Sequence, residues 1–208
     1  MKINSGNFLQ LLKMEHQQFA ESRCPVSRPT DNKWEQFLNS FVGDLKSFVA
    51  EKNLEVTSSI GKGIWAYIPW IRIAYPEISK KNTDGIFIGY EFGWEEHQAF
   101  ISLIQGVENL PEENRSQILA QNKIHIQQRV GSGSFNKIPV QWQPNIFGKK
   151  SKKERGWAYA EAMIFNKQYN LEMSPSQHQL ESDLQEAMDI YDKIRSVVLE
   201  DREIIQRY

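Results

Sequence analysis

The chain has 208 residues, of which 40% are hydrophobic, so it is long enough for one domain with a sizeable core. Its 25 basic and 26 acidic residues nearly cancel, which excludes a partner assignment from total charge, and the single cysteine, Cys24, excludes an intramolecular disulfide and a cysteine-cluster zinc site. Because no apolar run approaches the roughly 18 residues of a membrane span and the amino terminus lacks a signal-peptide core, we expect a cytoplasmic protein without a membrane partner.

The first part of the chain, residues 1–51, has the pattern of a helical lead-in. Its clearest apolar positions recur at helical spacing, and they are Trp34, Phe37, Leu38, Phe41, Val42, Leu45, Phe48 and Val49. Asp31 is suited to cap the second of two helices, which a loop between Pro25 and Pro29 would join.

Residues 56–107 change to short β-type runs separated by glycine and proline, which predicts a sheet. A helix is expected over 111–128 and a long loop over 130–156. A last strand over 157–168 and a helix over 174–205 follow. The fold class predicted from this order is α+β. We expect a single domain, 1–208, whose curved, mostly antiparallel sheet is packed by N-terminal and C-terminal helices.

Alternation along the strands predicts two different sheet faces. Ile71 and Ile73 would point into the core, and Trp70 would point the other way together with Phe87, Gly89 and Glu91. An aromatic ring, a position without a side chain and a carboxylate could together receive a small planar ligand, with Trp157 as another wall. The alternative is that Trp70, Phe87 and Trp157 fill a second apolar layer under the helices.

The strongest local charge lies in residues 148–156, GKKSKKERG. Its basic members are Lys149, Lys150, Lys152, Lys153 and Arg155, against one acid, Glu154. Such a patch suffices for contacts to nucleic-acid phosphates, and the alternative is a solvated surface loop.

The other chemically reactive residues do not form a recognisable site. His16, His97, His125 and His178 are scattered without ligand spacing, so no metal site is expected. A metal-dependent nuclease is disfavoured, because Gly93 stands where a lysine should follow Glu91. We therefore expect no catalytic residue and no cofactor.

Three stretches carry a family resemblance. They are SSIGKGIWAYIPWIRI (58–73), TDGIFIGYEFGWEEHQAFISLIQGV (83–107), and EAMIFNKQYN (161–170) with the terminal helix. Together they resemble the amino-terminal DNA-recognition domain of McrB-like modification-dependent (type IV) restriction proteins, from about residue 34 to residue 198. The IPW block and its spacing to GIFIGYEF are the specific part.

The resemblance implies a domain that binds duplex DNA and flips a modified cytosine, such as 5-methylcytosine, into an aromatic pocket. In the family this domain targets a restriction and phage-defence system, joined to an AAA+ GTPase that partners a nuclease subunit. The chain contains no G-x-x-x-x-G-K-[ST] motif. We therefore expect a recognition module that is not an enzyme, with motor and nuclease on other domains or subunits.

The family's pocket residues carry over to Trp70, Phe87 and, through a loose alignment, Trp157. Lys62 occupies the turn position that fills the gap left by the flipped base, and Ile64 is the alternative wedge.

Glu91 stands where the family has an apolar residue beside the 5-substituent of the base. As an ionised acceptor it would favour a polar or bulkier modification, so that Glu91→Leu restores preference for the methyl group. The alternative is that Glu91 points outward and pairs with a lysine such as Lys62.

Two other functions remain open from the sequence. The chain could be a protein-interaction module that uses its terminal helices, or a reader of modified single-stranded RNA that uses the same aromatic pocket. The sequence leaves the modified base open among 5-methylcytosine, 5-hydroxymethylcytosine and N6-methyladenine.

Overall fold

A computed structural model describes residues 2–13, 33–61, 69–81, 83–92, 98–135, 159, 161–170, 172 and 174–201. The helices in these ranges are α1 (Ser5–Lys13), α3 (Lys33–Phe48), α4 (Arg115–Arg129) and α6 (Gln177–Glu200). The strands are β1 (Glu55–Ser59), β2 (Trp70–Ala74), β3 (Ile86–Phe92), β4 (Gln98–Gln105) and β5 (Met163–Asn170).

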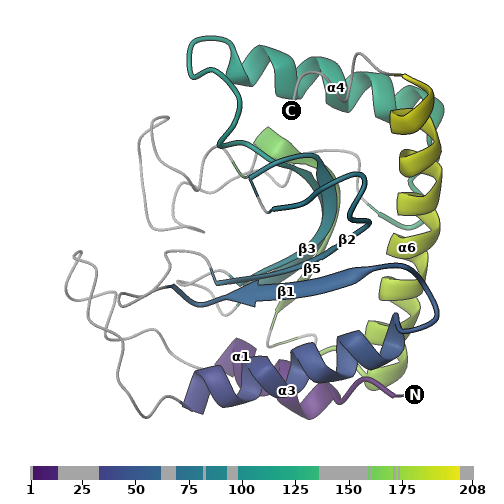
Figure 1. Cartoon of the computed structure of the whole chain (residues 1–208). Coiled ribbons are helices and arrows are strands. Elements are labelled where there is room, and N and C mark those ends of the chain that lie inside the picture. Colours follow the sequence, from purple (N-terminus) through teal and green to yellow (C-terminus); the bar gives the residue numbers. More distant parts are fainter. Residues whose placement is uncertain are drawn as a thin grey trace.

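The strands form one curved sheet in the order β1-β2-β3-β4-β5, and each strand runs antiparallel to its neighbours. Figure 1 shows α1 and α3 on one side of this sheet and α4 on the other, with α6 running alongside between them. The predicted α+β class, with an antiparallel sheet packed by N-terminal and C-terminal helices, is confirmed.

The main core lies on the face of the sheet that is turned toward α1, α3 and α6. Ile71, Ile73 and Tyr90 are fully buried there, as the strand alternation predicts. Phe8 of α1 joins the layers, because its ring centroid lies 5.3 Å from that of Phe41 on α3 and 6.2 Å from that of Tyr90 on β3. Burial of these large rings is the main apolar contribution to stability on this face.

The long helix α6 begins at a cap and is held to the sheet by one buried stripe. The side chain of Ser176 accepts a hydrogen bond from the backbone N–H of Gln179 (3.1 Å), which satisfies a helix-end donor. The predicted stripe is buried throughout, and its members are Leu180, Leu184, Met188, Tyr191, Ile194 and Val198. The hydroxyl of Tyr191 donates to the backbone oxygen of Ile86 (2.5 Å), so the helix is also tied to β3 by a hydrogen bond.

Several boundaries differ from those that the sequence predicts. The last strand starts at Met163 rather than at residue 157, and residues 161–162 are helical. The last helix ends at Glu200. The loop between Pro25 and Pro29 and the cap at Asp31 lie outside the described residues.

The connection from β2 to β3 makes a close turn at Gly85, which has a positive φ of 64°. A Cβ at Gly85 would lie 1.9 Å from the backbone oxygen of Ile78. The turn is therefore closed to any other residue without movement of the backbone.

We expect Gly85→Ala to lower the free energy of unfolding by roughly 2 kcal/mol or more, through backbone strain and this clash. Gly43→Ala is the matched control, because Gly43 is exposed within α3 and a Cβ there meets nothing within 4 Å. The control should raise the free energy of unfolding by roughly 0.5–1 kcal/mol. Urea denaturation measures both, and equal effects of the two substitutions would contradict the role of Gly85.

Candidate functional site

The second face of the sheet carries three rows of side chains that run across the strands. The outer row consists of Ser59, Trp70, Glu91, Phe100 and Gln168. The middle row consists of Thr57, Arg72, Gly89, Ser102 and Asn166. The inner row includes Phe87, Ile104 and Met163.

The inner row is a closed apolar cluster. Phe87 is 3% exposed and packs with Ile104, Met163 and Leu119, the last of which comes from α4. The side-chain amide of Gln105 donates to the backbone oxygen of Leu119 (3.1 Å), which ties α4 to β4. Phe87 thus occupies a second apolar layer under a helix, which is the alternative raised for it from the sequence. Its role as a wall of a ligand pocket stays a prediction.

The middle row places polar groups in the interior of the sheet. Arg72, Ser102 and Asn166 are each at most 1% exposed, and Glu91 of the outer row is 2% exposed. Polar side chains buried in this way are destabilising unless hydrogen bonds compensate, and they are a frequent feature of functional sites. We call Arg72, Glu91, Ser102 and Asn166 the polar stripe.

Gly89 lies at the centre of the polar stripe, and the carboxyl group of Glu91 lies over it. A Cβ at Gly89 would be 1.9 Å from Oε1 of Glu91. The position without a side chain therefore accommodates a carboxyl group of the chain itself, where the sequence analysis expects room for a ligand.

Glu91 is held as a neutral acid at neutral pH. Burial raises the pKa of its carboxyl group to about 8, and the hydrogen bond that Ser102 Oγ donates to Oε2 (2.8 Å) only partly opposes this rise. The ionised acceptor assumed from the sequence is thus the minor form at pH 7. Because Glu91 is buried, it does not point out into solvent, and Lys62 lies outside the described residues.

Arg72 uses its guanidinium group to hold the turn that follows β2. Its Nε donates to Ser79 Oγ (3.1 Å), Nη2 donates to the backbone oxygen of Ser79, and Nη1 lies 3.5 Å from Thr57 Oγ1. Burial lowers the pKa of Arg72. These contacts give Arg72 a structural role within the polar stripe.

Trp70 is the partly exposed aromatic residue of the outer row. It is the first residue of β2 and lies directly opposite Glu91 on β3. The pairing continues beyond the strand, since the N–H of Phe92 donates to the backbone oxygen of Pro69 (3.1 Å). The other predicted site residues lie outside the described part of the chain, and they are Lys62, Ile64, Lys149, Lys150, Lys152, Lys153, Arg155 and Trp157.

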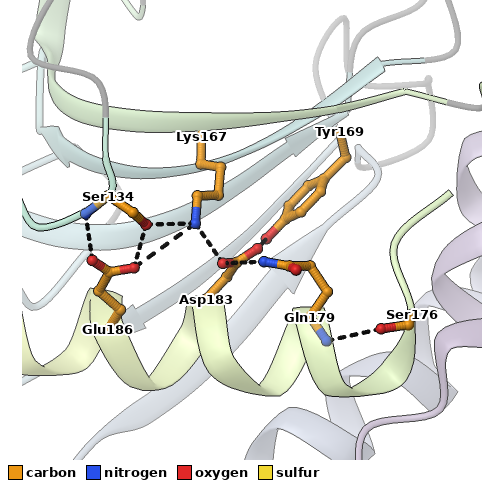
Figure 2. Close-up of polar contacts among 7 residues, drawn as sticks. All are labelled: Ser134, Lys167, Tyr169, Ser176, Gln179, Asp183 and Glu186. Carbon is orange, nitrogen blue, oxygen red and sulfur yellow. Dashed lines mark hydrogen bonds and ion pairs between the residues drawn. The ribbon is translucent and has the colours of Figure 1, made fainter. Parts of the chain in front are cut away.

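A second polar cluster lies on the opposite face, between β5 and α6 (Figure 2). Lys167 donates to Asp183 (2.5 Å) and to Ser134 Oγ (2.7 Å), and Ser134 donates to Glu186 through both its N–H and its hydroxyl. Partial burial disfavours the ionised form of Glu186, but the bonds from Ser134 and the charge of Lys167 leave its pKa below the usual value. Since each charged group faces an opposite charge, we interpret this cluster as a structural connection.

Three residues of the polar stripe, Arg72, Ser102 and Asn166, are not among the site residues predicted from the sequence. Ser102 could be found by the alternation already applied to β3, because it stands between the apolar Phe100 and Ile104 on the second face. Asn166 has no such contrast, because Lys167, Gln168 and Asn170 of the same strand are also polar. The signal for Ser102 in the sequence is that it is a single polar residue at an inward-facing position of an otherwise apolar strand.

The chain matches the family described as "MrcB-like, N-terminal domain" over residues 19–196. No curated protein matches the chain. Among the described helices, none combines the length and the apolar character that a membrane crossing requires. No group of three His, Cys, Asp or Glu side chains is placed to hold a metal ion within the described ranges.

The raised pKa of Glu91 predicts a pH-dependent stability. Between the ordinary value of 4.5 and the folded value of about 8, the unfolded chain loses this proton and the folded chain keeps it. The free energy of unfolding should therefore fall as pH rises from 5 to 8, by up to about 1.4 kcal/mol per pH unit. Glu91→Gln keeps an acceptor for Ser102 and removes the titrating group. The free energy of unfolding of this variant, relative to that of the unsubstituted chain, should therefore increase from pH 5 to pH 8.

Urea denaturation at pH 5, 6.5 and 8 measures this difference. Glu112→Gln is the matched control, because Glu112 is exposed and this variant should follow the unsubstituted chain. Parallel pH profiles of Glu91→Gln and the unsubstituted chain would show that Glu91 is not held protonated.

Proposed function

Because the chain belongs to the family of MrcB-like N-terminal domains, we propose that it binds duplex DNA carrying a modified base, as the recognition module of a restriction system. The family match covers residues 19–196, which include all five described strands and most of α6. The resemblance identified from the IPW block and GIFIGYEF is thereby confirmed.

The base we propose is a modified cytosine, flipped out of the duplex against the outer row of the second face. The observation that carries this proposal is the pairing of the partly exposed Trp70 with the buried polar group of Glu91 on the neighbouring strand. Unstacking a base costs a few kcal/mol, and stacking on an aromatic side chain returns roughly 1–3 kcal/mol. Polar groups beside the ring would then distinguish the edge of the base.

Recognition is the whole of the activity that we assign to this domain. The polar stripe offers hydrogen-bonding groups to a ligand. Glu91 is the carboxylic acid of the stripe that could act as a general base toward a nucleophile, and it is protonated at neutral pH. We propose that translocation and cleavage belong to an AAA+ GTPase domain and a nuclease subunit that act with this module in the cytoplasm.

The first test is binding of the chain to one duplex that carries, in turn, cytosine, 5-methylcytosine, 5-hydroxymethylcytosine and N6-methyladenine. We expect a preference for a modified cytosine, and we expect Trp70→Ala to remove most of this preference by taking away the stacking surface. Fluorescence anisotropy measures the affinities, and circular dichroism shows that each variant is folded.

Ile124→Ala is the matched control, because Ile124 is an apolar side chain on α4 that is 56% exposed and lies outside the three rows. It should keep the ranking of the four duplexes. Equal affinity of the folded chain for all four would overturn the proposed function. Binding of single-stranded RNA in preference to every duplex would indicate an RNA reader, and a lack of any nucleic-acid binding would indicate a protein-interaction module.

The basic loop provides a separate test of the DNA contact. Replacing Lys149, Lys150, Lys152, Lys153 and Arg155 by glutamine should weaken binding to modified and unmodified duplexes alike, because phosphate contacts carry no sequence information. The slope of log K against log salt should become shallower by about 0.9 for each phosphate that the variant no longer neutralises. Salt titrations of the variant and the unsubstituted chain measure this change.

The control replaces Lys13 and Lys46, exposed lysines of α1 and α3 on the other side of the sheet. Their replacement should leave the slope unchanged. If removal of the five loop charges also leaves it unchanged, the loop does not contact DNA.

A further inference from the structure

Helix α1 lies outside the residues that match the family, yet it is packed into the main core beneath Trp70 and its strand neighbours. The match begins at residue 19, and α1 spans Ser5–Lys13. We propose that α1 is a positioning element, in which Phe8 fixes the end of β3 and, through it, the start of β2 where Trp70 lies. This role rests on the proposed function, in which Trp70 is the stacking surface.

The start of α1 is held by hydrogen bonds to two other helices. The backbone N–H of Ile3 donates to Glu181 Oε1 on α6 (2.9 Å). The next N–H, that of Asn4, donates to Asp44 Oδ2 on α3 (3.1 Å). The bond from Ile3 lowers the pKa of Glu181, so this acceptor is ionised at neutral pH and the bond is charge-assisted. Helix α1 therefore cannot shift relative to α3 and α6 without breaking these bonds.

Phe8 is fully buried and contacts aromatic rings from three other elements. Its ring centroid lies 5.3 Å from that of Phe41 on α3 and 5.3 Å from that of Tyr169 on β5. It lies 6.2 Å from the ring of Tyr90 and 6.0 Å from the ring of Phe92, both on β3. All four are tilted or edge-to-face contacts, an arrangement that stabilises aromatic pairs beyond the burial of their area.

Two of these rings belong to the residues on either side of Glu91. Tyr90 and Phe92 face the main core, and Glu91 between them faces the second layer. The ring of Phe92 also makes an edge contact with Trp34 of α3, at a centroid distance of 5.8 Å. The end of β3 is thus supported from the first face by one ring of α1 and one ring of α3.

The backbone of Phe92 connects this support to β2. Its N–H donates to the backbone oxygen of Pro69 (3.1 Å), the residue before Trp70. Trp70 itself is paired with Glu91 on β3. Because Trp70 is only partly buried, backbone contacts to β3 help to fix its ring where burial does so incompletely. Loss of the Phe8 ring should therefore loosen Phe92 and Trp70 without removing any group of the second face.

A stacking residue that is not held in place must be ordered when the ligand binds, and this cost lowers the affinity. For one aromatic side chain the loss is roughly two- to tenfold. A residue that only stabilises the fold would change the folded fraction and leave the affinity of the folded chain unchanged.

The test compares Phe8→Leu with the unsubstituted chain in two measurements. The first is affinity for the modified duplex that the unsubstituted chain prefers, by fluorescence anisotropy, with the folded fraction measured by circular dichroism. We expect a loss of roughly two- to tenfold.

The second measurement is hydrogen exchange of the Phe92 amide, followed by NMR. The Gly106 amide is the internal reference, because it donates to the backbone oxygen of Gly85 (2.8 Å) at the other end of β3. In Phe8→Leu the exchange of Phe92 should become faster than that of Gly106 by about threefold or more, relative to the unsubstituted chain. If circular dichroism shows that Phe8→Leu is unfolded, Phe8→Met takes its place, because the flexible methionine fills more of the space and keeps the same expected direction.

Ile194→Ala is the matched control. Ile194 is also fully buried in the main core, but it lies on α6 beside Arg195, which contacts Glu77 in the connection after β2. Urea denaturation should show that both substitutions lower stability, because both remove core packing. Ile194→Ala should nevertheless keep the affinity of the unsubstituted chain and its ratio of Phe92 to Gly106 exchange.

The outcomes separate positioning from stability. Weaker binding and faster relative exchange of Phe92 in Phe8→Leu, with neither change in Ile194→Ala, support the proposal. Equal effects of the two substitutions, or no change in either measurement for folded Phe8→Leu, overturn it while the preference of the unsubstituted chain still supports the proposed function. Equal binding of all four duplexes by the folded unsubstituted chain overturns the proposed function and the positioning role with it.

Discussion

The central strand β3 is buried along its whole length, on both faces of the sheet. Each side chain of β3 therefore faces one of two buried layers. The alternation of side chains along the strand decides which layer it faces. Ile88, Tyr90 and Phe92 belong to the main core, where the rings of Tyr90 and Phe92 contact Phe8 of α1 and Tyr90 also contacts Phe41 of α3. Phe87, Gly89 and Glu91 face the second interior, which α4 closes over the apolar row. The position of every other strand follows from its register with β3.

The second interior contains a polar stripe where an apolar layer would be more stabilising. A buried polar group contributes little net stability even when it is hydrogen-bonded, and a neutral acid at pH 7 also makes stability decrease with rising pH. Ser102 and Glu91 form one hydrogen bond of 2.8 Å in the middle of two apolar strands. Such an arrangement is unfavourable for folding alone, and it supports the proposal that Glu91 belongs to a ligand-binding site.

Much of this architecture follows from the sequence because strand alternation is a local property. It separates Ile71 and Ile73 from Trp70, and it places Phe87, Gly89 and Glu91 together, as the structure confirms. The charge state of Glu91 could not be predicted in the same way, because it depends on burial by strands that are distant in the sequence. The space over Gly89 could not be predicted for a different reason, because it depends on how the side chain of Glu91, two residues away, is oriented. The start of β5 was misplaced because the WAYAEAM pattern suits a strand and a short helical turn equally well.

Under the proposed function, the network that holds α6 and the recognition site lie on different faces of the sheet. Lys167 belongs to the same cross-sheet line as Ile71, Tyr90 and Ile101, and it faces α6 through Asp183 and Glu186. This network fixes residues 133–135 against α6 on the first face, since Gly133 has a positive φ of 54° and leaves no room for a Cβ beside Glu186. The bonds that join α6 to the sheet through Lys167 and Tyr191 lie on the first face, whereas Arg72 of the polar stripe holds the β2–β3 turn. Under the proposed function, substitutions at Trp70 and Glu91 should therefore change ligand binding while the connections that hold α6 to the sheet stay intact.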